Sequence, residues 1–444
     1  MKIITFSKVY KKNKSNILRF NQMKTLKILV PYATGHETTS IRTLLFNNMI
    51  PILKKRVNVK IQRILYQPEK LKTIPVINSD IITLDLHNYD NAIDVLKKEK
   101  PDIIYANPYT GFIDFAFVSA AKFLNIPVFS ILNYEHSSKG SFDILKSHTR
   151  NFLSNYVEVE VSNNKKSFMR RGKFILYKFS FLVKTIYSLQ LGFIKNTKTM
   201  ILFIKLLLFP SKTLDSRLAV TKHYLRNETQ KKELLELGFD PDSLLVTGHP
   251  MFDESFKKTK LSKSVDINKI KILLAPDPFY ESGIWTKKQH ELILTQIITT
   301  IIKNNFSLQI KLHPSSTVLC EYEPLIHSID SNIEIFQEGS LEDFLDNADV
   351  ILSYSSQSTG LVYSIIHRKP IIICNFFDHL DNKILDAGLA LECKEPSQLV
   401  DLILKSINFN NLYEQKRNDY IKKYFYKDDG NASSRICDDL LKLI

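Results

Sequence analysis

The chain has 444 residues, which is enough for two to three domains of ordinary size, and 44% of them are hydrophobic, as in a globular protein with a sizeable core. A net charge of +15 favours partners that carry phosphate, namely nucleic acid, anionic lipid or nucleotide-linked substrates. The four cysteines are scattered without a CxxC pair, which excludes a disulfide framework and a zinc site and suits a reducing cytoplasm.

The N-terminal stretch is basic and lacks the apolar core of a signal peptide. We expect residues 1–23 to be a disordered lead, with Met23 as a candidate native start. A first α/β domain is expected over residues 24–253, and it opens with a strand at 24–30, a Gly-containing turn and a helix that begins at Ile41. Strands and helices then alternate, with strands near 57–64, 101–106 and 126–131 and helices at 91–98 and 115–124. This alternation is typical of a doubly wound parallel sheet.

Residues 161–214 break the pattern, because they contain no Asp or Glu while Lys and Arg recur among large apolar side chains. No segment stays apolar for about 18 residues, so a membrane-spanning helix is not expected. The composition predicts one or two basic amphipathic helices that lie in an anionic membrane surface. A basic helical pair that packs on the protein itself is the alternative. We expect no nucleic-acid partner, since the apolar content exceeds what a phosphate-tracking surface needs.

The α/β pattern resumes with a strand expected at 216–221, a helix capped by Asn227 and a strand at 243–246. A polar, Lys-rich segment at 257–269 indicates the hinge before a second α/β domain, expected over 254–410. Its strands are predicted at 270–275, 306–312, 333–336, 348–352 and 371–373, with helices between them, the longest at 288–303. The helical tail, 411–444, is expected to cross back to the first domain.

A Ser-rich turn joins the strand at 348–352 to the helix after it and supplies Ser355, Ser356, Ser358 and Thr359. A helix N-terminus carries a partial positive charge and free N–H groups, so it attracts phosphate. Hydroxyl side chains cap such a helix and can also donate to phosphate oxygens. The turn is therefore a candidate phosphate site, with ordinary cap and loop residues as the alternative.

Other polar residues of the second domain follow predicted strands. His313 ends the strand at 306–312, Pro314 stiffens the backbone beside it, and Ser315 comes next. An imidazole in this position can donate to a phosphate. Glu338 follows the strand at 333–336 and is a candidate acceptor for ribose or base hydrogen bonds, although a surface carboxylate is the alternative.

In the first domain, His36 and Glu37 follow the first Gly turn, and either is a candidate general base for an acceptor hydroxyl. His136 is a third candidate, and solvated loop residues are the alternative for all three. Gly248 and His249 follow the strand at 243–246 and are placed by the hinge, at the edge of the expected cleft.

Several common motifs are absent from the sequence. It has no P-loop, no GxGxxG and no GxSxG, which argues against P-loop kinases, Rossmann dehydrogenases and α/β-hydrolases. No pair of aspartates follows a strand in the way that a metal site would require. We therefore expect neither a metal nor a cofactor, with a nucleotide-linked donor as substrate.

Three stretches resemble nucleotide-sugar enzymes of the GT-B fold: LLVTGHPMFD at 244–253, KLHPSS at 311–316, and the segment 337–373. The resemblance is strongest to the group that holds CDP-glycerol glycerophosphotransferases, capsule polysaccharide transferases and bacterial polysialyltransferases. It covers residues 216–400, and over 24–135 it is only architectural. It implies two Rossmann-like domains facing a cleft, with a His-Pro motif and a Ser/Thr-rich turn at the donor phosphates, here His313, Pro314, Ser355, Ser356, Ser358 and Thr359.

UDP-GlcNAc 2-epimerases share this fold, but their motif pairs an Asp-Ser-Gly-Gly turn with an acidic residue on the next helix. Here no acidic residue follows the turn before Asp378. We therefore predict a metal-independent transferase on the cytoplasmic face of the membrane. It would move a glycosyl or polyol-phosphate group from a nucleotide-activated donor to a lipid-linked or glycan acceptor in cell-surface polysaccharide biosynthesis. A 2-epimerase and a non-catalytic GT-B relic are the alternatives.

Overall fold

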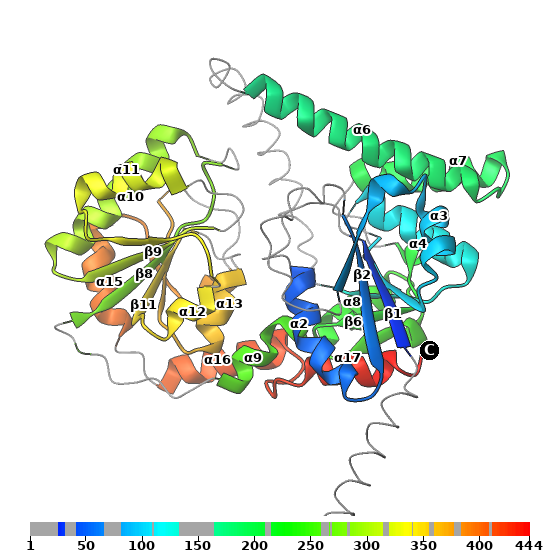
Figure 1. Ribbon diagram of the computed structural model, residues 1–444. Coiled ribbons are helices and arrows are strands. Elements are labelled where there is room, and N and C mark those ends of the chain that lie inside the picture. The colour runs from blue at the N-terminus through cyan, green and yellow to red at the C-terminus, as the bar shows by residue number, and fades with distance from the viewer. Residues whose placement is uncertain are drawn as a thin grey trace, which may run out of the picture.

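The protein is described here from a computed structural model in which two α/β domains lie side by side (Figure 1). The structure describes residues 25–31, 41–65, 81–108, 111–132, 164–208, 215–258, 266, 269–281, 285–313, 319–339, 341–354, 359–376, 383–407 and 411–444. Within these residues, no helix combines the length and the apolar character that crossing a bilayer requires.

The first domain is built on a parallel sheet of seven strands in the order β3-β2-β1-β4-β5-β6-β7. The strands are β1 (Thr25–Pro31), β2 (Asn58–Leu65), β3 (Ile81–Asp85), β4 (Ile103–Tyr105), β5 (Val128–Ile131), β6 (Lys222–Leu225) and β7 (Leu244–Val246). The central strands β1, β4 and β5 are mostly buried and apolar because helices cover both faces of the sheet. The strand order reverses between β1 and β4, as in other doubly wound folds.

Helices pack on the two faces of this first sheet. One face carries α2 (Ile41–Lys54) and α17 (Ala432–Leu440), which contact each other. The opposite face carries α3 (Ala92–Glu99), α4 (Phe112–Leu124), α6 (Asn164–Ser188) and α7 (Phe193–Leu208). The shorter helix α8 (Glu228–Glu236) covers β6 and β7, and Asn227 caps it as predicted.

The second domain has a six-stranded parallel sheet in the order β10-β9-β8-β11-β12-β13. Its strands are β8 (Lys271–Ala275), β9 (Ser307–Lys311), β10 (Glu334–Phe336), β11 (Val350–Ser353), β12 (Ile371–Cys374) and β13 (Leu391–Cys393). One face is covered by α10 (Lys287–Lys303), α11 (Leu319–Ile329) and α15 (Leu399–Ser406). The other is covered by α12 (Leu341–Leu345), α13 (Thr359–Ile366), α14 (Lys383–Asp386) and α16 (Asn411–Tyr424).

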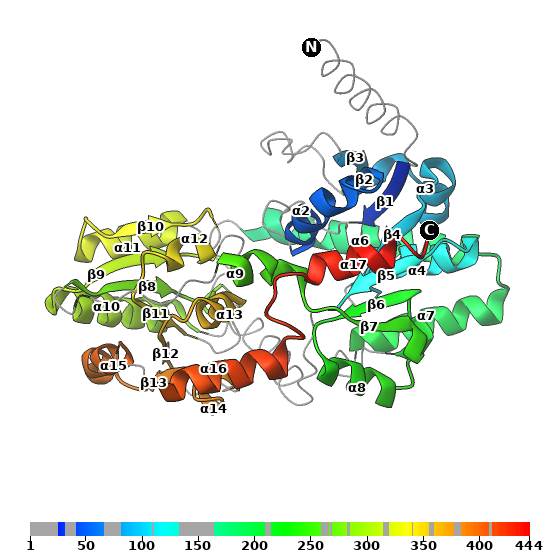
Figure 2. The ribbon, with the colours of Figure 1, turned by 90° about the horizontal axis from the view of Figure 1, so that it is seen from below.

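The chain crosses between the domains twice. The first crossing leaves β7 through a short 3-10 helix, η6 (Pro250–Phe252), and α9 (Asp253–Lys258). The second connects α16, on the second domain, to α17, on the first (Figure 2). The Phe252 ring lies 5.3 Å from the Tyr363 ring of α13 and 5.3 Å from the Phe425 ring, so the two crossings pack together in one apolar core.

One predicted strand of the first domain is wrong. Residues 216–218 form the 3-10 helix η4 (Ser216–Leu218), whose N-cap Asp215 accepts a hydrogen bond from the Arg217 backbone N–H at 2.9 Å. The strand that joins the sheet is β6, which begins only at Lys222. A local cap therefore outcompetes the extended conformation that the apolar residues alone suggest.

Candidate functional site

The order of the second sheet reverses between β8 and β11, and ligands of doubly wound sheets bind outside the carboxyl ends of strands at such a point. A carboxylate links the two strands there. Asp277, in the loop after β8, accepts hydrogen bonds from the Ser353 hydroxyl at 2.9 Å and from the Tyr354 backbone N–H at 3.2 Å, both through Oδ2. These bonds fix the first residue of the Ser-rich turn against the loop after β8. No motif in the sequence indicates Asp277, because it stands alone there.

The helix that follows the Ser-rich turn is in place, since α13 begins at Thr359. Its residues Leu361, Ile365 and Ile366 are buried, so the apolar side of the helix holds it on the sheet. Three of the predicted phosphate ligands, Ser355, Ser356 and Ser358, lie outside the described residues, and the Thr359 side chain does too. Their role as ligands stays a prediction.

His313 follows β9, the neighbour of β8, and its side chain is exposed at the sheet edge. Partial burial of the ring, together with the positive charge of Lys311, lowers the pKa of His313 below its usual 6.5. The imidazole is therefore neutral at neutral pH and keeps one N–H donor. Pro314 and Ser315, the other predicted residues of this loop, lie outside the described part of the chain.

Lys311 sets the loop after β9 against the loop after β10. Lys311 is 4% exposed, and its ammonium group donates to the Leu312 carbonyl at 2.9 Å and to the Gln337 carbonyl at 2.8 Å. Burial lowers the pKa of Lys311. The next residue after Gln337 is Glu338, which is exposed. Through Lys311, the structure thus places the loops of His313 and Glu338 beside each other, as neighbouring strands require.

A second set of polar residues, Glu281, Tyr322 and His290, lies next to the loop after β8. The Tyr322 hydroxyl donates to Glu281 Oε1 at 2.7 Å, and burial raises the pKa of Glu281. His290 stacks edge-on against Tyr322 with ring centroids 4.9 Å apart, and burial lowers its pKa to about 4. Among the described residues, His290 Nδ1 and the hydroxyl of the fully buried Tyr354 have no hydrogen-bond partner. No motif in the sequence indicates this group, because its members come from separate elements.

Gly248 and His249 lie at the junction of the domains. His249 is 3% exposed, and its Nδ1 accepts a hydrogen bond from the Met251 backbone N–H at 3.3 Å at the start of η6. Burial lowers its pKa to about 3. Gly248 has a φ of 83°, and a Cβ there would lie 3.3 Å from the Ala432 Cβ of α17. Both residues therefore shape the crossing between the domains.

The acceptor side of the site falls largely outside the described residues. His36, Glu37 and His136 all lie there, so the choice of general base stays a prediction. In the loop after β4, the Asn107 backbone N–H donates to the buried carboxylate of Asp114 at 3.0 Å, which holds that loop to α4. Within the described ranges, no group of three His, Cys, Asp or Glu side chains could hold a metal ion.

The sequence matches no protein-family model and no curated protein. Solved structures match along almost the whole chain. The UDP-GlcNAc 2-epimerase from Neisseria meningitidis bound to UDP-GlcNAc has a TM-score of 0.52 and 18% identity, over 94% of this chain and all (100%) of that one. The glycotransferase of kitacinnamycin has a TM-score of 0.51 and 8% identity over 95% and 100%. Os79 from O. sativa in complex with UDP has a TM-score of 0.52 and 8% identity over 94% and 100%.

These likenesses, at identities this low, establish the fold. The protein has the GT-B architecture of two parallel-sheet α/β domains, and its structural neighbours include nucleotide-sugar epimerases and glycosyltransferases.

Proposed function

We propose that the protein is a transferase that moves a glycosyl or polyol-phosphate group from a nucleotide-activated donor to a lipid-linked or glycan acceptor in cell-surface polysaccharide biosynthesis. One observation carries the proposal. Four adjacent strands of the second sheet, β10, β9, β8 and β11, end in loops that bear Glu338, His313, Asp277 and Tyr354. This edge is where a doubly wound domain of the GT-B neighbours' type binds a nucleotide ligand.

The donor diphosphate would lie at the N-terminus of α13, where backbone N–H groups and the predicted ligands of the Ser-rich turn would bind it. His313, neutral before the donor binds, would give one hydrogen bond to a phosphate oxygen. Negative charge develops on the leaving phosphate during transfer, and fixed donors aimed at it lower the barrier without a metal. Asp277 would act as a positioning residue, since its bonds to Ser353 and Tyr354 hold the start of the turn.

The acceptor would approach from the first domain, where His36 or Glu37 would take the proton from its hydroxyl. An acceptor linked to lipid would bring the enzyme to the inner face of the cell membrane as a peripheral protein. The basic segment at 161–214 would supply the contact with anionic lipid.

A UDP-GlcNAc 2-epimerase is the second candidate, because several of the structural neighbours are such enzymes. Against it stands the composition of α13, which contains no acidic residue, whereas the epimerase motif places one on this helix. The third candidate is a non-catalytic GT-B protein that binds a nucleotide or a partner without turnover.

The test uses the purified full-length chain with CDP-, CMP-, UDP- and GDP-linked donors in the presence of EDTA, with nucleotide release and acceptor labelling as readouts. Turnover of one donor class is expected, and His313→Ala should reduce it about a hundredfold. His87→Ala is the matched control, since His87 is an exposed histidine of the other domain. Conversion of UDP-GlcNAc to its 2-epimer without transfer would contradict the transferase proposal. Nucleotide binding without turnover would favour a non-catalytic protein.

A further inference from the structure

Helices α6 and α7 present two different faces. One face packs on the first domain and buries Phe181, Leu182, Thr185, Ile186, Leu189 and Phe203. The Phe203 ring lies 4.8 Å from the Phe112 ring and 5.1 Å from the Phe115 ring of α4. These contacts make the helix pair part of the domain core rather than a loose appendage.

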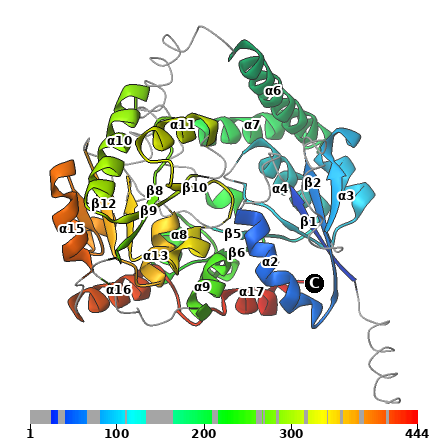
Figure 3. The same ribbon diagram turned by 60° about the vertical axis from the view of Figure 1, so that its left-hand side comes forward.

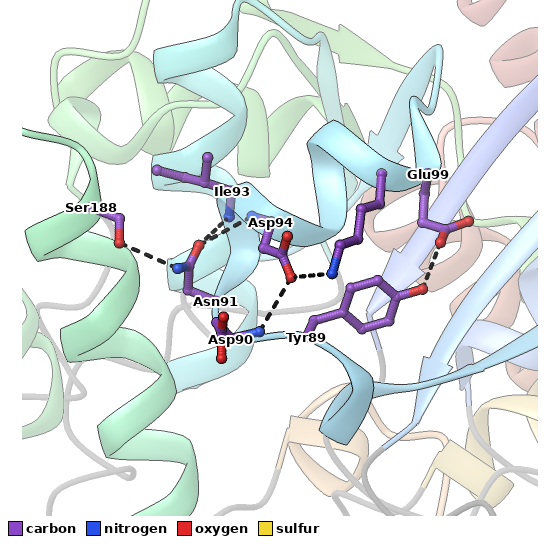
Figure 4. A network of polar contacts seen from close by, with 8 residues as sticks. Tyr89, Asp90, Asn91, Ile93, Asp94, Glu99 and Ser188 are labelled. Atoms are coloured by element: carbon purple, nitrogen blue, oxygen red, sulfur yellow. Dashed lines mark hydrogen bonds and ion pairs between the residues drawn. The ribbon is translucent and has the colours of Figure 1, made fainter.

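Polar contacts fix the pair in the same position. The Ala92 backbone N–H donates to the Thr185 hydroxyl at 3.1 Å. Asn91, which caps α3 through its side-chain oxygen, uses its amide N–H to donate to the Ser188 hydroxyl at 3.2 Å (Figure 4). The end of α6 is thereby attached to the start of α3, so the other face of the helices has a defined orientation.

That other face is apolar and exposed. Fifteen large hydrophobic side chains are exposed among the described residues, and eight of them fall within residues 176–204. Phe193 is 77% exposed, Ile194 70% and Leu176 68%. We name these eight side chains the docking face: Leu176, Phe179, Tyr187, Leu191, Phe193, Ile194, Ile201 and Ile204.

Helix geometry places most of these side chains on one side of each helix. At 100° per residue, Leu176 and Tyr187 share one side of α6, away from the buried Phe181 and Thr185. Phe179 lies at the margin of that side, and its ring is 6.1 Å from the Phe112 ring of α4. The same rule puts Ile194 and Ile201 opposite Phe203 on α7, with Phe193 and Ile204 about a quarter turn from it. Leu191 lies in the elbow between the helices. Single exposed apolar residues are ordinary, whereas a concentration of them on two successive helices indicates an interaction site.

The positive charge of residues 161–214 indicates which kind of partner binds the docking face. The chain has 46 Asp and Glu residues, yet none falls between residues 161 and 214, where the Lys and Arg residues are Lys165, Lys166, Arg170, Arg171, Lys173, Lys178, Lys184, Lys195, Lys198, Lys205 and Lys212. Lys184, Lys195 and Lys198 are exposed beside the docking face. Apolar side chains flanked by lysines and free of carboxylates match the acyl and phosphate layers of an anionic bilayer.

We propose that the docking face lies on a membrane that contains anionic lipid, with Phe193 and Ile194 at the elbow as the deepest insertion. A nucleic acid would use the lysines but would leave the apolar side chains in water. The helices lie on the opposite side of the first domain from α17 (Figures 1 and 3), so docking leaves the crossings between the domains uncovered. The inference rests on the placement of these side chains and on the charge of the segment, and it does not require transferase activity.

The test is sedimentation of the full-length protein with vesicles of phosphatidylcholine alone or of phosphatidylcholine with phosphatidylglycerol. We expect binding to the anionic vesicles and little to the neutral ones. The double variant Phe193→Ser/Ile194→Ser should bind the anionic vesicles at least about tenfold more weakly. Lys195→Glu/Lys198→Glu should weaken binding as well, and added salt should weaken that of the wild-type chain.

The matched control is Leu235→Ser/Leu237→Ser, which removes two exposed leucines from the region of α8 and should leave vesicle binding unchanged. Failure of the wild-type protein to bind, equal binding to neutral vesicles, or full binding by the Phe193/Ile194 variant would each overturn the proposal. Salt-sensitive binding to RNA without vesicle binding would overturn it too and assign the lysines to nucleic acid. Turnover of a water-soluble donor, measured on the same samples, reports separately on the proposed function.

Discussion

Asp253 and Ala432 lie 179 residues apart in the chain and are joined by a hydrogen bond of 2.9 Å from the Ala432 backbone N–H to Oδ1. The second oxygen of the same carboxylate accepts from the Ser433 backbone N–H at 2.7 Å. Both residues that meet here, Asp253 and Ala432, are buried. Asp253, in the first crossing between the domains, thus caps the N-terminus of α17, the helix that follows the second crossing. This cap holds the C-terminal helix on the first domain.

Replacing Asp253 with Ala should destabilise the protein by about 3 kcal/mol. The change leaves two buried N–H groups at the start of α17 without an acceptor and removes a negative charge from a helix N-terminus. Urea unfolding of the full chain measures the loss, and hydrogen exchange should locate it in α17.

The control for this change is Asp438→Ala on the same helix. Asp438 is half-exposed and pairs with Arg56 at the surface, so its removal should cost less than about 1 kcal/mol. Equal losses for the two variants would show that the cap contributes no more than a surface ion pair.

Gly430 should not tolerate a side chain. Its φ is +64°, and a Cβ there would lie 2.6 Å from the Asp253 carbonyl oxygen and 2.8 Å from Lys257 Cγ. Gly192 has a similar φ of +84° with nothing within 4 Å of the added atom. Gly192→Ala should therefore cost about 1 kcal/mol of backbone strain, while Gly430→Ala should cost about 2 kcal/mol more. Chemical denaturation of both variants gives the difference, and equal costs would contradict the close approach at the crossing.

Two buried histidines should make the fold sensitive to acid. Burial lowers the pKa of His223 and of His249 to about 3, and each ring accepts a backbone N–H, from Val220 and from Met251, through a nitrogen that must stay unprotonated. Because the unfolded chain takes up these protons below about pH 6.5 and the folded chain does not, stability is complete above that pH and falls as the pH drops toward 3. The loss between about pH 6.5 and about pH 4.5 should be on the order of 5 kcal/mol for the two histidines together.

The pH effect is measured from urea midpoints at constant ionic strength. The variant His223→Gln/His249→Asn keeps an acceptor oxygen near each N–H but cannot titrate, so its stability should change less over the same pH range. A double variant that remains as sensitive to acid as the wild-type chain would place the proton uptake elsewhere.

The sequence predicts most of the sheet from its buried strands, because strands covered on both faces are short apolar runs. It fails at one edge of each sheet. The strands β3 and β13 were not predicted, since each is only partly buried and mixes polar with apolar residues. Helix α11 was missed too, because Pro324 stands inside it and an internal Pro normally ends a helix.

The residues of the candidate site were likewise only partly predictable from the sequence. The loops of His313 and Glu338 could be placed from the ends of their strands, because parallel strands bring such loops to one edge. Asp277 and Lys311 could not be found, since their importance rests on contacts to Tyr354 and Gln337, which are distant in the chain. A lone Asp or Lys carries no pattern from which such a pairing can be inferred.

The role of Asp277 can be separated from plain strand pairing, because the same two strands carry a matching bond at their other end. Asp349, just before β11, accepts a hydrogen bond through Oδ2 from the backbone N–H of Lys271, the first residue of β8, at 2.9 Å. Asp277 Oδ2 accepts from the Tyr354 backbone N–H after both strands end. Asp277→Ala and Asp349→Ala should each cost about 1 to 2 kcal/mol in urea unfolding. Only Asp277→Ala should also raise the KM for the nucleotide donor, by about tenfold, because only that bond holds the Ser-rich turn at the sheet edge where ligands bind. A rise in KM for both variants, or for neither, would remove Asp277 from the donor site and leave it a structural link between β8 and β11.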